Sequence, residues 1–181
     1  MMRMSLLGLS PALLAMLAIT AGGPAAPAAI PPPKPPLSAA ERQALAERNL
    51  RESAAFLAAN AKRPEVATFP SGLQYEVLQP GSGPPVRDGD RVTLKFEWFR
   101  ADGRHVQVLD GGAPVTVYPS ELMPPGFAEA VRRMPAGAKW KIYVPPALGF
   151  GAAGRGDPLG PNTVLVIECE LLRLAPGKPP A

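Results

Sequence analysis

Cysteine and histidine are almost missing from this chain of 181 residues, which holds one of each. Cys169 has no partner within the chain, so no intramolecular disulfide can form, and a lone buried cysteine usually packs as a small apolar side chain. His105 alone cannot supply the several ligands that a metal site needs. We therefore expect no metal centre and no catalytic or redox role for Cys169.

Long runs of one charge are missing as well. Nineteen Lys and Arg stand against fifteen Asp and Glu, the net charge is +4, and the charges are scattered along the chain. Proteins that bind nucleic acids usually gather basic residues in a patch or stripe. The sequence therefore does not favour a nucleic-acid partner, and a mildly basic surface that keeps the protein soluble is the simpler interpretation.

Proline and glycine, by contrast, are abundant, with 25 and 18 residues, and seven of the prolines fall within residues 24–36. Before them, Arg3 precedes an apolar run over residues 6–21 and then small residues, as in a secretory signal peptide. The run is short for a transmembrane span. We expect a signal peptide over residues 1–28, a Pro/Ala-rich linker over 29–37, export to the periplasm and no stable membrane insertion after cleavage. The alternative is an uncleaved anchor in the inner membrane.

A helix is predicted over residues 38–63. Ser38 and Glu41 have the spacing of a capping box, and the residues that follow are mostly Ala, Leu, Glu and Arg, which favour helices. The apolar stripe of this helix is thin, so it can bury little surface. Three alternatives remain at this point: the helix lies against the rest of the chain, floats free, or forms a homodimer with a second copy.

Residues 71–175 have the pattern of one α+β domain, and residues 176–181 that of a disordered tail. Residues 91–99 alternate so that every second side chain shares one face, residues 139–144 alternate likewise, and residues 164–174 form a long apolar strand that we expect at the centre. A helix of about two turns is predicted over residues 127–134. Several short strands with one embedded helix favour an antiparallel α+β domain.

The segment over residues 123–154, MPPGFAEAVRRMPAGAKWKIYVPPALGFGAAG, resembles the FKBP-type peptidyl-prolyl isomerases. Their pattern reads V-I-P-G-[WF]-x-E-[AG]-[LV]-x-x-M-x-x-G-x-[KR], then I-P-P-x-L-[AG]-[YF]-G. The resemblance continues through SGLQYEVLQPGSGP (71–84) and PNTVLVIECELL (161–172). It implies an FKBP-like antiparallel sheet of about five to six strands curved around one short helix, with an N-terminal helical extension.

The junction over residues 49–78, NLRESAAFLAANAKRPEVATFPSGLQYEVL, is similar to exported bacterial FKBPs of the macrophage-infectivity-potentiator type. Those relatives carry a longer helical arm that dimerises, which is why a homodimer through the N-terminal helix is among the expected partners. The family resemblance also implies an isomerase that assists protein folding on X-Pro segments of unfolded or flexible polypeptides, without a cofactor.

Such an enzyme needs no acid, base or nucleophile. Rotation about an X-Pro bond is slow because amide resonance must be broken, with a barrier of about 18–20 kcal/mol. A catalyst can bind the twisted amide better than either planar isomer, and a dry apolar pocket favours the twisted form because its charges are less separated. Hydrogen-bond donors beside the turning bond add orientation.

The resemblance places the substrate-binding pocket at eight positions: Phe96, Val106, Gln107, Met123, Pro124, Phe127, Phe150 and Ile167. At several of them this chain departs from the family. Phe96 and Phe150 stand where relatives have tyrosines, Gln107 replaces a carboxylate, and smaller side chains replace two phenylalanines at Val106 and Ile167. Losing one hydrogen-bond donor typically costs about 0.5–1.5 kcal/mol. We therefore expect weakened isomerase activity and poor binding of macrolide ligands.

Other interpretations stay open. The pocket and the helix could hold clients without catalysis, as a periplasmic chaperone or binding module that keeps the FKBP fold, or the fold could serve as the scaffold of a tethered envelope protein. The aromatic residues Phe127 and Trp140 could also be plain core, which is our prediction for Trp140.

Overall fold

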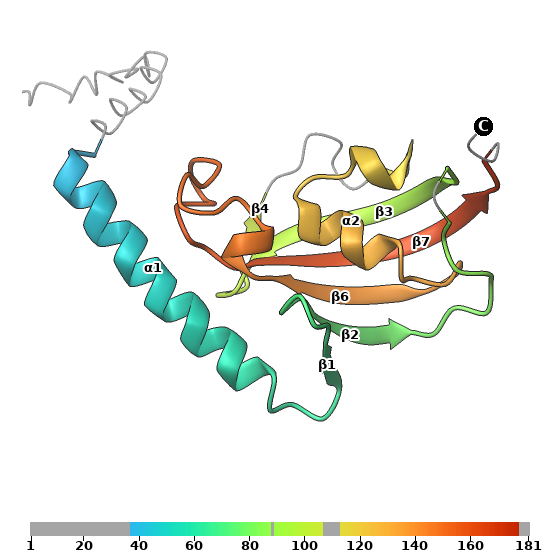
Figure 1. The fold of residues 1–181 in the computed structure, drawn as a ribbon, viewed down its shortest axis with the longest axis horizontal. Coiled ribbons are helices and arrows are strands. Elements are labelled where there is room, and N and C mark those ends of the chain that lie inside the picture. Colours follow the sequence, from blue (N-terminus) through green and yellow to red (C-terminus); the bar gives the residue numbers. More distant parts are fainter. Residues whose placement is uncertain (1–36, 88, 107–112, 178–181) are drawn as a thin grey trace, which may run out of the picture. The chain divides into compact units, whose positions relative to one another are not determined.

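A computed structural model describes residues 37–87, 89–106 and 113–177. Figure 1 shows one long helix followed by a sheet that carries a short helix. The elements in chain order are α1 (Ala39–Asn60), β1 (Val66–Thr68), β2 (Gln74–Gln79), β3 (Arg91–Arg100), β4 (His105–Val106), β5 (Val115–Val117), η1 (Pro119–Glu121), α2 (Pro125–Val131), β6 (Lys139–Val144), η2 (Pro146–Leu148) and β7 (Leu165–Ala175).

The sheet is antiparallel throughout, with strand order β1-β2-β6-β7-β3-β4 and with β5 paired to β3. The long apolar strand β7 lies between β6 and β3, so its predicted central place is confirmed. The described part of the sheet has seven strands rather than the expected five to six. The strand β1 lies before the predicted start of the domain at residue 71 and pairs with β2 at the sheet edge over three residues. Three residues are too few to display an alternating pattern.

One face of the sheet forms the main core against α2. Strand pairing places Phe96 opposite Cys169 and Trp98 opposite Ile167, so these side chains share that face. Phe127 and its neighbours on α2 pack into the same apolar cluster. The predicted α+β fold, a sheet around one short helix, is confirmed.

The short helix begins and ends earlier than the predicted range of residues 127–134. It starts at Pro125, because proline suits the first position of a helix, where its missing N–H would have no partner. It ends at Val131, and residues 132–133 form a turn that leads to Met134 and Pro135. A residue that precedes proline is disfavoured in helical conformation, which explains why Met134 is not helical.

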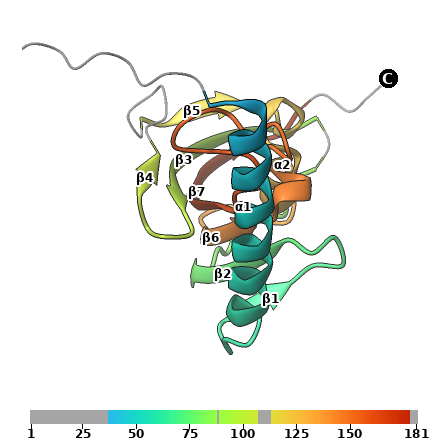
Figure 2. The same ribbon diagram turned by 90° about the vertical axis from the view of Figure 1, so that its left-hand side faces the viewer.

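The other face of the sheet is partly covered by α1, which Figure 2 shows in front of the strands. Phe56 and Leu57 of α1 pack against a small apolar cluster that contains Tyr143 and Val166. The buried residues of α1, however, are polar: Asn49, Ser53 and Asn60. Of the three alternatives that the sequence left open, the described chain thus has the helix lying against the domain.

Hydrogen bonds join α1 to the long connection between β6 and β7. Asn49 Nδ2 donates to the Pro161 carbonyl at 2.7 Å, and Ser53 Oγ donates to the Asn162 carbonyl at 2.7 Å. Ser53 Oγ also accepts from the Val164 amide at 3.2 Å, while Asn162 Nδ2 donates to the Ala46 carbonyl. At its start, α1 has the predicted capping box between Ser38 and Glu41. These hydrogen bonds therefore help to hold α1 against the domain, because the thin apolar stripe of the helix can bury little surface.

Candidate functional site

Two aromatic rings meet between α2 and the sheet. Phe127 of α2 is fully buried, and Phe96 of β3 is half-buried; their centroids lie 5.1 Å apart in an edge-on arrangement. The helix can come this close because Gly126 has no side chain: a Cβ there would lie 2.7 Å from Val144 Cγ1. The sequence Pro-Gly-Phe therefore starts the helix, lets it approach β6 and inserts the ring.

Two further rings extend this pair toward the surface. Trp98 follows Phe96 on the same face of β3, with ring centroids 6.2 Å apart, and Phe150 lies 5.9 Å from Trp98. Phe150 is half-buried on the connection between β6 and β7, in the glycine-flanked position seen in the sequence. The Arg155 guanidinium from the same connection lies over both rings, 5.2 Å from Trp98 and 5.5 Å from Phe150.

Five of the eight predicted positions belong to one apolar cluster with Trp98: Phe96, Val106, Phe127, Phe150 and Ile167. Val106 and Ile167 flank Trp98 on the two neighbouring strands. Pro124 is buried at the start of α2, whereas Met123 is 59% exposed. Gln107 lies outside the described residues. We call Phe96, Trp98, Phe127 and Phe150 the ring cluster.

Trp98 is the member that sequence reasoning missed. Its side chain is 5% exposed, and its Nε1 atom is buried without a hydrogen-bond partner in the part of the chain that the structure describes. The alternation of β3 did place Trp98 on the face of Phe96. That spacing of two residues was the available signal, but the family pattern assigns no role to this position.

The chain's other tryptophan and its cysteine are core residues, as predicted. Trp140 stacks on Tyr75 with centroids 4.4 Å apart. Cys169 is fully buried, and burial raises the pKa of its thiol far above the ordinary value. A thiol in that state is neither a nucleophile nor a metal ligand.

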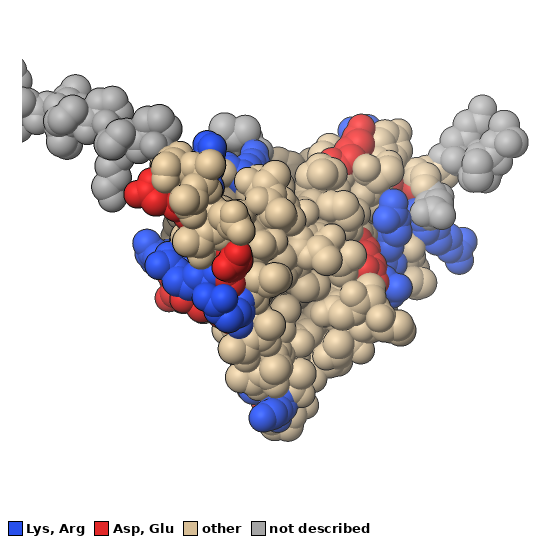
Figure 3. Space-filling model, turned by 60° about the vertical axis from the view of Figure 1, so that its left-hand side comes forward, with Lys and Arg blue, Asp and Glu red and all other residues tan. Residues whose placement is uncertain are grey.

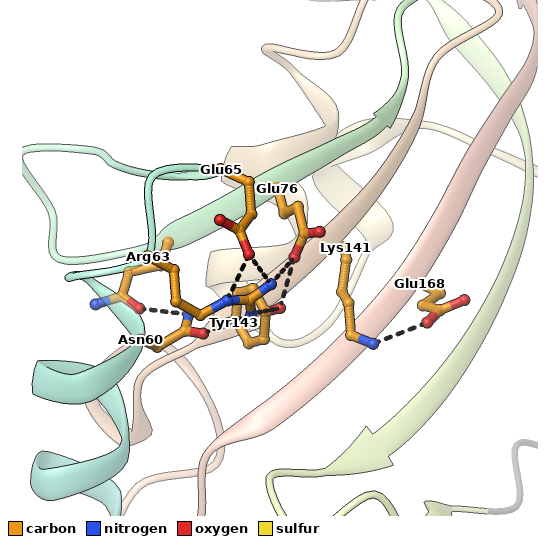
Figure 4. Close-up of polar contacts among 8 residues, drawn as sticks. Asn60, Arg63, Glu65, Glu76, Lys141, Tyr143 and Glu168 are labelled. Atoms are coloured by element: carbon orange, nitrogen blue, oxygen red, sulfur yellow. Dashed lines mark hydrogen bonds and ion pairs between the residues drawn. The ribbon is translucent and has the colours of Figure 1, made fainter.

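A polar network lies where the end of α1 meets the sheet (Figure 4). Arg63 donates to Glu65 at 2.6 Å, to Glu76 at 2.9 Å and to the Tyr143 hydroxyl at 2.9 Å, and that hydroxyl donates to Glu76 at 3.0 Å. Desolvation by burial raises the pKa of Tyr143. Because the partners come from separate elements, no sequence spacing could have predicted the network.

Beside this network is a cavity of about 530 Å³ between α1 and the sheet. Its lining is mixed, with Phe56, Phe99 and Val166 as apolar members and Arg63, Lys141 and Glu168 as charged members. Lys141 and Glu168 pair with each other across the sheet at 3.1 Å. The cavity could hold an amphipathic group but offers no arrangement of catalytic residues.

The charged side chains do not single out another site. On the face shown in Figure 3, basic side chains lie in small groups beside acidic ones. Within residues 37–87, 89–106 and 113–177, no group of three or more His, Cys, Asp or Glu could hold a metal ion. No helix in these ranges is long and apolar enough to span a membrane.

The described chain thus has an α+β domain of FKBP-like architecture with an apolar ring cluster between α2 and the sheet. The chain belongs to the FKBP-type peptidyl-prolyl cis-trans isomerase family: residues 83–172 match the model of that family, and residues 37–77 match the domain that precedes it in FKBP-type isomerases. The predicted family and its macrophage-infectivity-potentiator-like subgroup are confirmed.

Several relatives resemble this chain. It is 40% identical over 128 residues to the peptidyl-prolyl cis-trans isomerase Mip of Coxiella burnetii, covering 68% of this chain and 54% of the relative. It is 36% identical over 134 residues to the outer membrane protein MIP of Legionella longbeachae, covering 74% and 57%. The chain thus spans little more than half the length of these relatives.

A crystal structure of a peptidyl-prolyl cis-trans isomerase from Pseudomonas syringae has a TM-score of 0.65 and 30% identity, covering 72% of this chain and 96% of that one.

Proposed function

We propose that the protein is a peptidyl-prolyl cis-trans isomerase that assists folding by acting on X-Pro bonds of unfolded or flexible polypeptides. The observation that carries the proposal is the ring cluster, with Phe96 and Phe127 5.1 Å apart beneath α2 in a chain of this family. The similarity to a protein named as an isomerase from Coxiella burnetii also supports it.

The mechanism follows from the apolar character of the cluster. A twisted X-Pro amide has less charge separation than a planar one, so an apolar surrounding favours the transition state over both ground states. Phe127, fully buried, would support the site from beneath, and the half-buried Phe96 and Phe150 would contact the proline ring. We propose Val106, Gln107, Met123, Pro124 and Ile167 as the remaining substrate-binding positions. No proton is transferred, so none of these residues acts as acid, base or nucleophile.

The rate enhancement is proposed to be reduced. Neither Phe96 nor Phe150 has a hydroxyl group to offer a substrate carbonyl, and Val106 and Ile167 present less surface than phenylalanine would. Each missing hydrogen bond is worth about 0.5–1.5 kcal/mol. Relative to the family pattern, this chain keeps the apolar side chains of the site better than the polar groups.

The primary test is the cis-to-trans rate of a short Leu-Pro peptide, measured with protein from about residue 29 onward. We expect acceleration by the wild type and its loss in Phe127→Ala, with Phe150→Ala as a second variant because its half-exposed ring can be removed without emptying the core. Tyr118→Ala, which removes an exposed ring elsewhere, is the matched control and should retain the rate. A folded wild type that gives no acceleration would contradict the proposal.

We further propose the cell envelope, specifically the periplasm, as the site of action. The support is the signal-peptide pattern of residues 1–28, outside the described residues, and the similarity to a relative named as an outer membrane protein. The proposed division continues with a linker over 29–37, the helix over 38–63, the isomerase domain over 71–175 and a tail over 176–181. Mass spectrometry of the protein from a periplasmic fraction would locate the cleavage site. Recovery only with detergent would instead indicate an uncleaved anchor.

A second function is favoured by a separate observation, the cavity of about 530 Å³ between α1 and the sheet. A chaperone or binding module could hold apolar client segments there, independently of the ring cluster. Suppressed aggregation of a proline-free client would support this function, and no suppression would count against it. A homodimer through the outer side of α1, where Leu50 is half-exposed, is tested by sedimentation of wild type and Leu50→Glu.

A further inference from the structure

The Trp98 indole holds a hydrogen-bond donor without an acceptor. Its Nε1 is the one buried side-chain nitrogen or oxygen atom without a partner in the part of the chain that the structure describes. Buried polar atoms in native proteins nearly always have partners, so an exception calls for a physical explanation. Here the exception lies inside the proposed substrate-binding cluster rather than elsewhere in the core.

Among residues 37–87, 89–106 and 113–177, the side chains found around the ring cannot accept this hydrogen bond. Phe96 and Phe150 contribute rings at 6.2 and 5.9 Å, and the Arg155 guanidinium over the indole has only donors. The strand neighbours Val106 and Ile167 are aliphatic. The ring is therefore surrounded by apolar groups and a cation, to which a carbonyl oxygen would be complementary.

We propose that Trp98 Nε1 donates a hydrogen bond to a main-chain carbonyl of the bound X-Pro segment. The inference rests on the proposed function of the ring cluster. It identifies a hydrogen-bond donor in that cluster, where the side chains of Phe96 and Phe150 have none. A donor fixed in an apolar site orients the substrate strongly, because no water competes for it. Arg155 covers the indole from the connection between β6 and β7 and is itself exposed, so its displacement would open Nε1 to a substrate carbonyl.

The decisive variant is Trp98→Phe, which retains an aromatic ring and deletes the N–H group. We expect kcat/KM for a Leu-Pro peptide to fall about three- to tenfold, the effect of losing one hydrogen bond. The thermal midpoint should fall somewhat, because the smaller ring leaves a cavity in the core, so both rates are measured at a temperature where the variant is fully folded. Trp140→Phe is the matched control: its ring stacks on Tyr75, so its rate should be unchanged.

A direct readout of the same bond is available because the chain has only two tryptophans. In ¹⁵N-labelled Trp140→Phe protein, one indole N–H signal remains, that of Trp98. Addition of the peptide Ala-Leu-Pro-Phe should move this signal downfield, as expected when a free N–H gains an acceptor, while Ala-Leu-Ala-Phe should move it less.

The outcomes separate this inference from the function on which it rests. An active wild type and an equally active Trp98→Phe variant would overturn the inference and leave the isomerase intact. Loss of rate in Trp98→Phe together with an unmoved Trp98 indole signal would also overturn it, because the ring would then act only through packing. If the wild type is inactive, the isomerase proposal fails. The indole signal then decides by itself whether Trp98 donates a hydrogen bond to a bound peptide. A downfield shift then supports a donor in a binding site, and an unmoved signal overturns it.

Discussion

The ring of Phe150 lies at the edge of the proposed substrate site and has no polar group. The residue is half-buried, and its ring lies 5.9 Å from Trp98 and beneath Arg155. A phenol in the same place would keep these contacts and add a donor at the solvent side of the cluster. The consequence can be measured by adding the hydroxyl rather than by deleting the ring.

Phe150→Tyr is expected to raise kcat/KM for a Leu-Pro peptide about two- to tenfold, because one new hydrogen bond contributes about 0.5–1.5 kcal/mol. Phe56→Tyr adds the same hydroxyl to α1, away from the ring cluster, and should leave the rate unchanged. Equal rates in wild type and Phe150→Tyr would show that the missing hydroxyl at this position does not limit the enzyme.

Cys169 gives a second prediction at this scale. The side chain is fully buried in the central strand, and burial raises the pKa of its thiol, so the reactive thiolate is scarce at neutral pH. We expect no reaction with a thiol reagent at pH 8 in the native protein and one thiol per chain in urea. Rapid native labelling would mean that β7 opens locally.

At the scale of elements, α1 and the β6–β7 connection depend on each other through Ser53. Its hydroxyl donates to the Asn162 carbonyl at 2.7 Å and accepts from the buried Val164 amide at 3.2 Å. Ser53→Ala leaves that amide without its acceptor, which typically costs about 1–3 kcal/mol of unfolding free energy. Urea denaturation should show this loss, whereas Ser71→Ala, an exposed serine, should change stability little. If Ser53→Ala and Ser71→Ala changed the unfolding free energy equally, water would already reach the contact between α1 and the β6–β7 connection.

How far the sequence predicts structure also differs by element. Alternation predicted β3 and β6, and the apolar run predicted the central place of β7, because period-two patterns report burial on one face directly. The docking of α1 was not predictable, since it depends on which backbone carbonyls the folded connection presents to Asn49 and Ser53. The hydrogen-bond network around Arg63 was not predictable either, because its partners come together only in the folded chain. In the ring cluster, the family pattern predicted Phe96, Phe127 and Phe150. Alternation placed Trp98 on the face of Phe96, but its contacts with the other rings are known only from the folded structure.

For the molecule as a whole, Asp90 links two distant parts of the chain. Its carboxylate accepts from the backbone N–H of Arg87 at 2.8 Å and of Gly177 at 3.0 Å, which connects the start of β3 to the segment after β7. These hydrogen bonds, that of Arg87 first, hold the pKa of Asp90 below its ordinary value of 3.8. The capping hydrogen bonds from Ser38 lower the pKa of Glu41 in the same way.

Both carboxyls have lower pKa values folded than unfolded. Their stabilisation is therefore fully present above the unfolded values, near 4, and is lost as the pH falls through the folded values. We expect the thermal midpoint to be level from pH 7 to about 5 and to drop below pH 4. Asp90→Asn should lower the midpoint at pH 7 and flatten part of the acid limb. An unchanged acid limb would assign the pH dependence to other carboxyls.

The polar attachment of α1 has a thermodynamic consequence. Its buried residues are Asn49, Ser53 and Asn60, so detachment of the helix would expose much hydrogen-bonding surface and little apolar surface. Heat capacity and denaturant sensitivity both grow with the surface exposed, and heat capacity grows with its apolar part. Opening of α1 should therefore carry a smaller heat-capacity change, for the surface it exposes, than unfolding of the sheet. Native-state amide exchange of the Val164 N–H, measured as a function of temperature, would show this opening as a free energy with little curvature, and the connection that carries Phe150 and Arg155 would share that equilibrium.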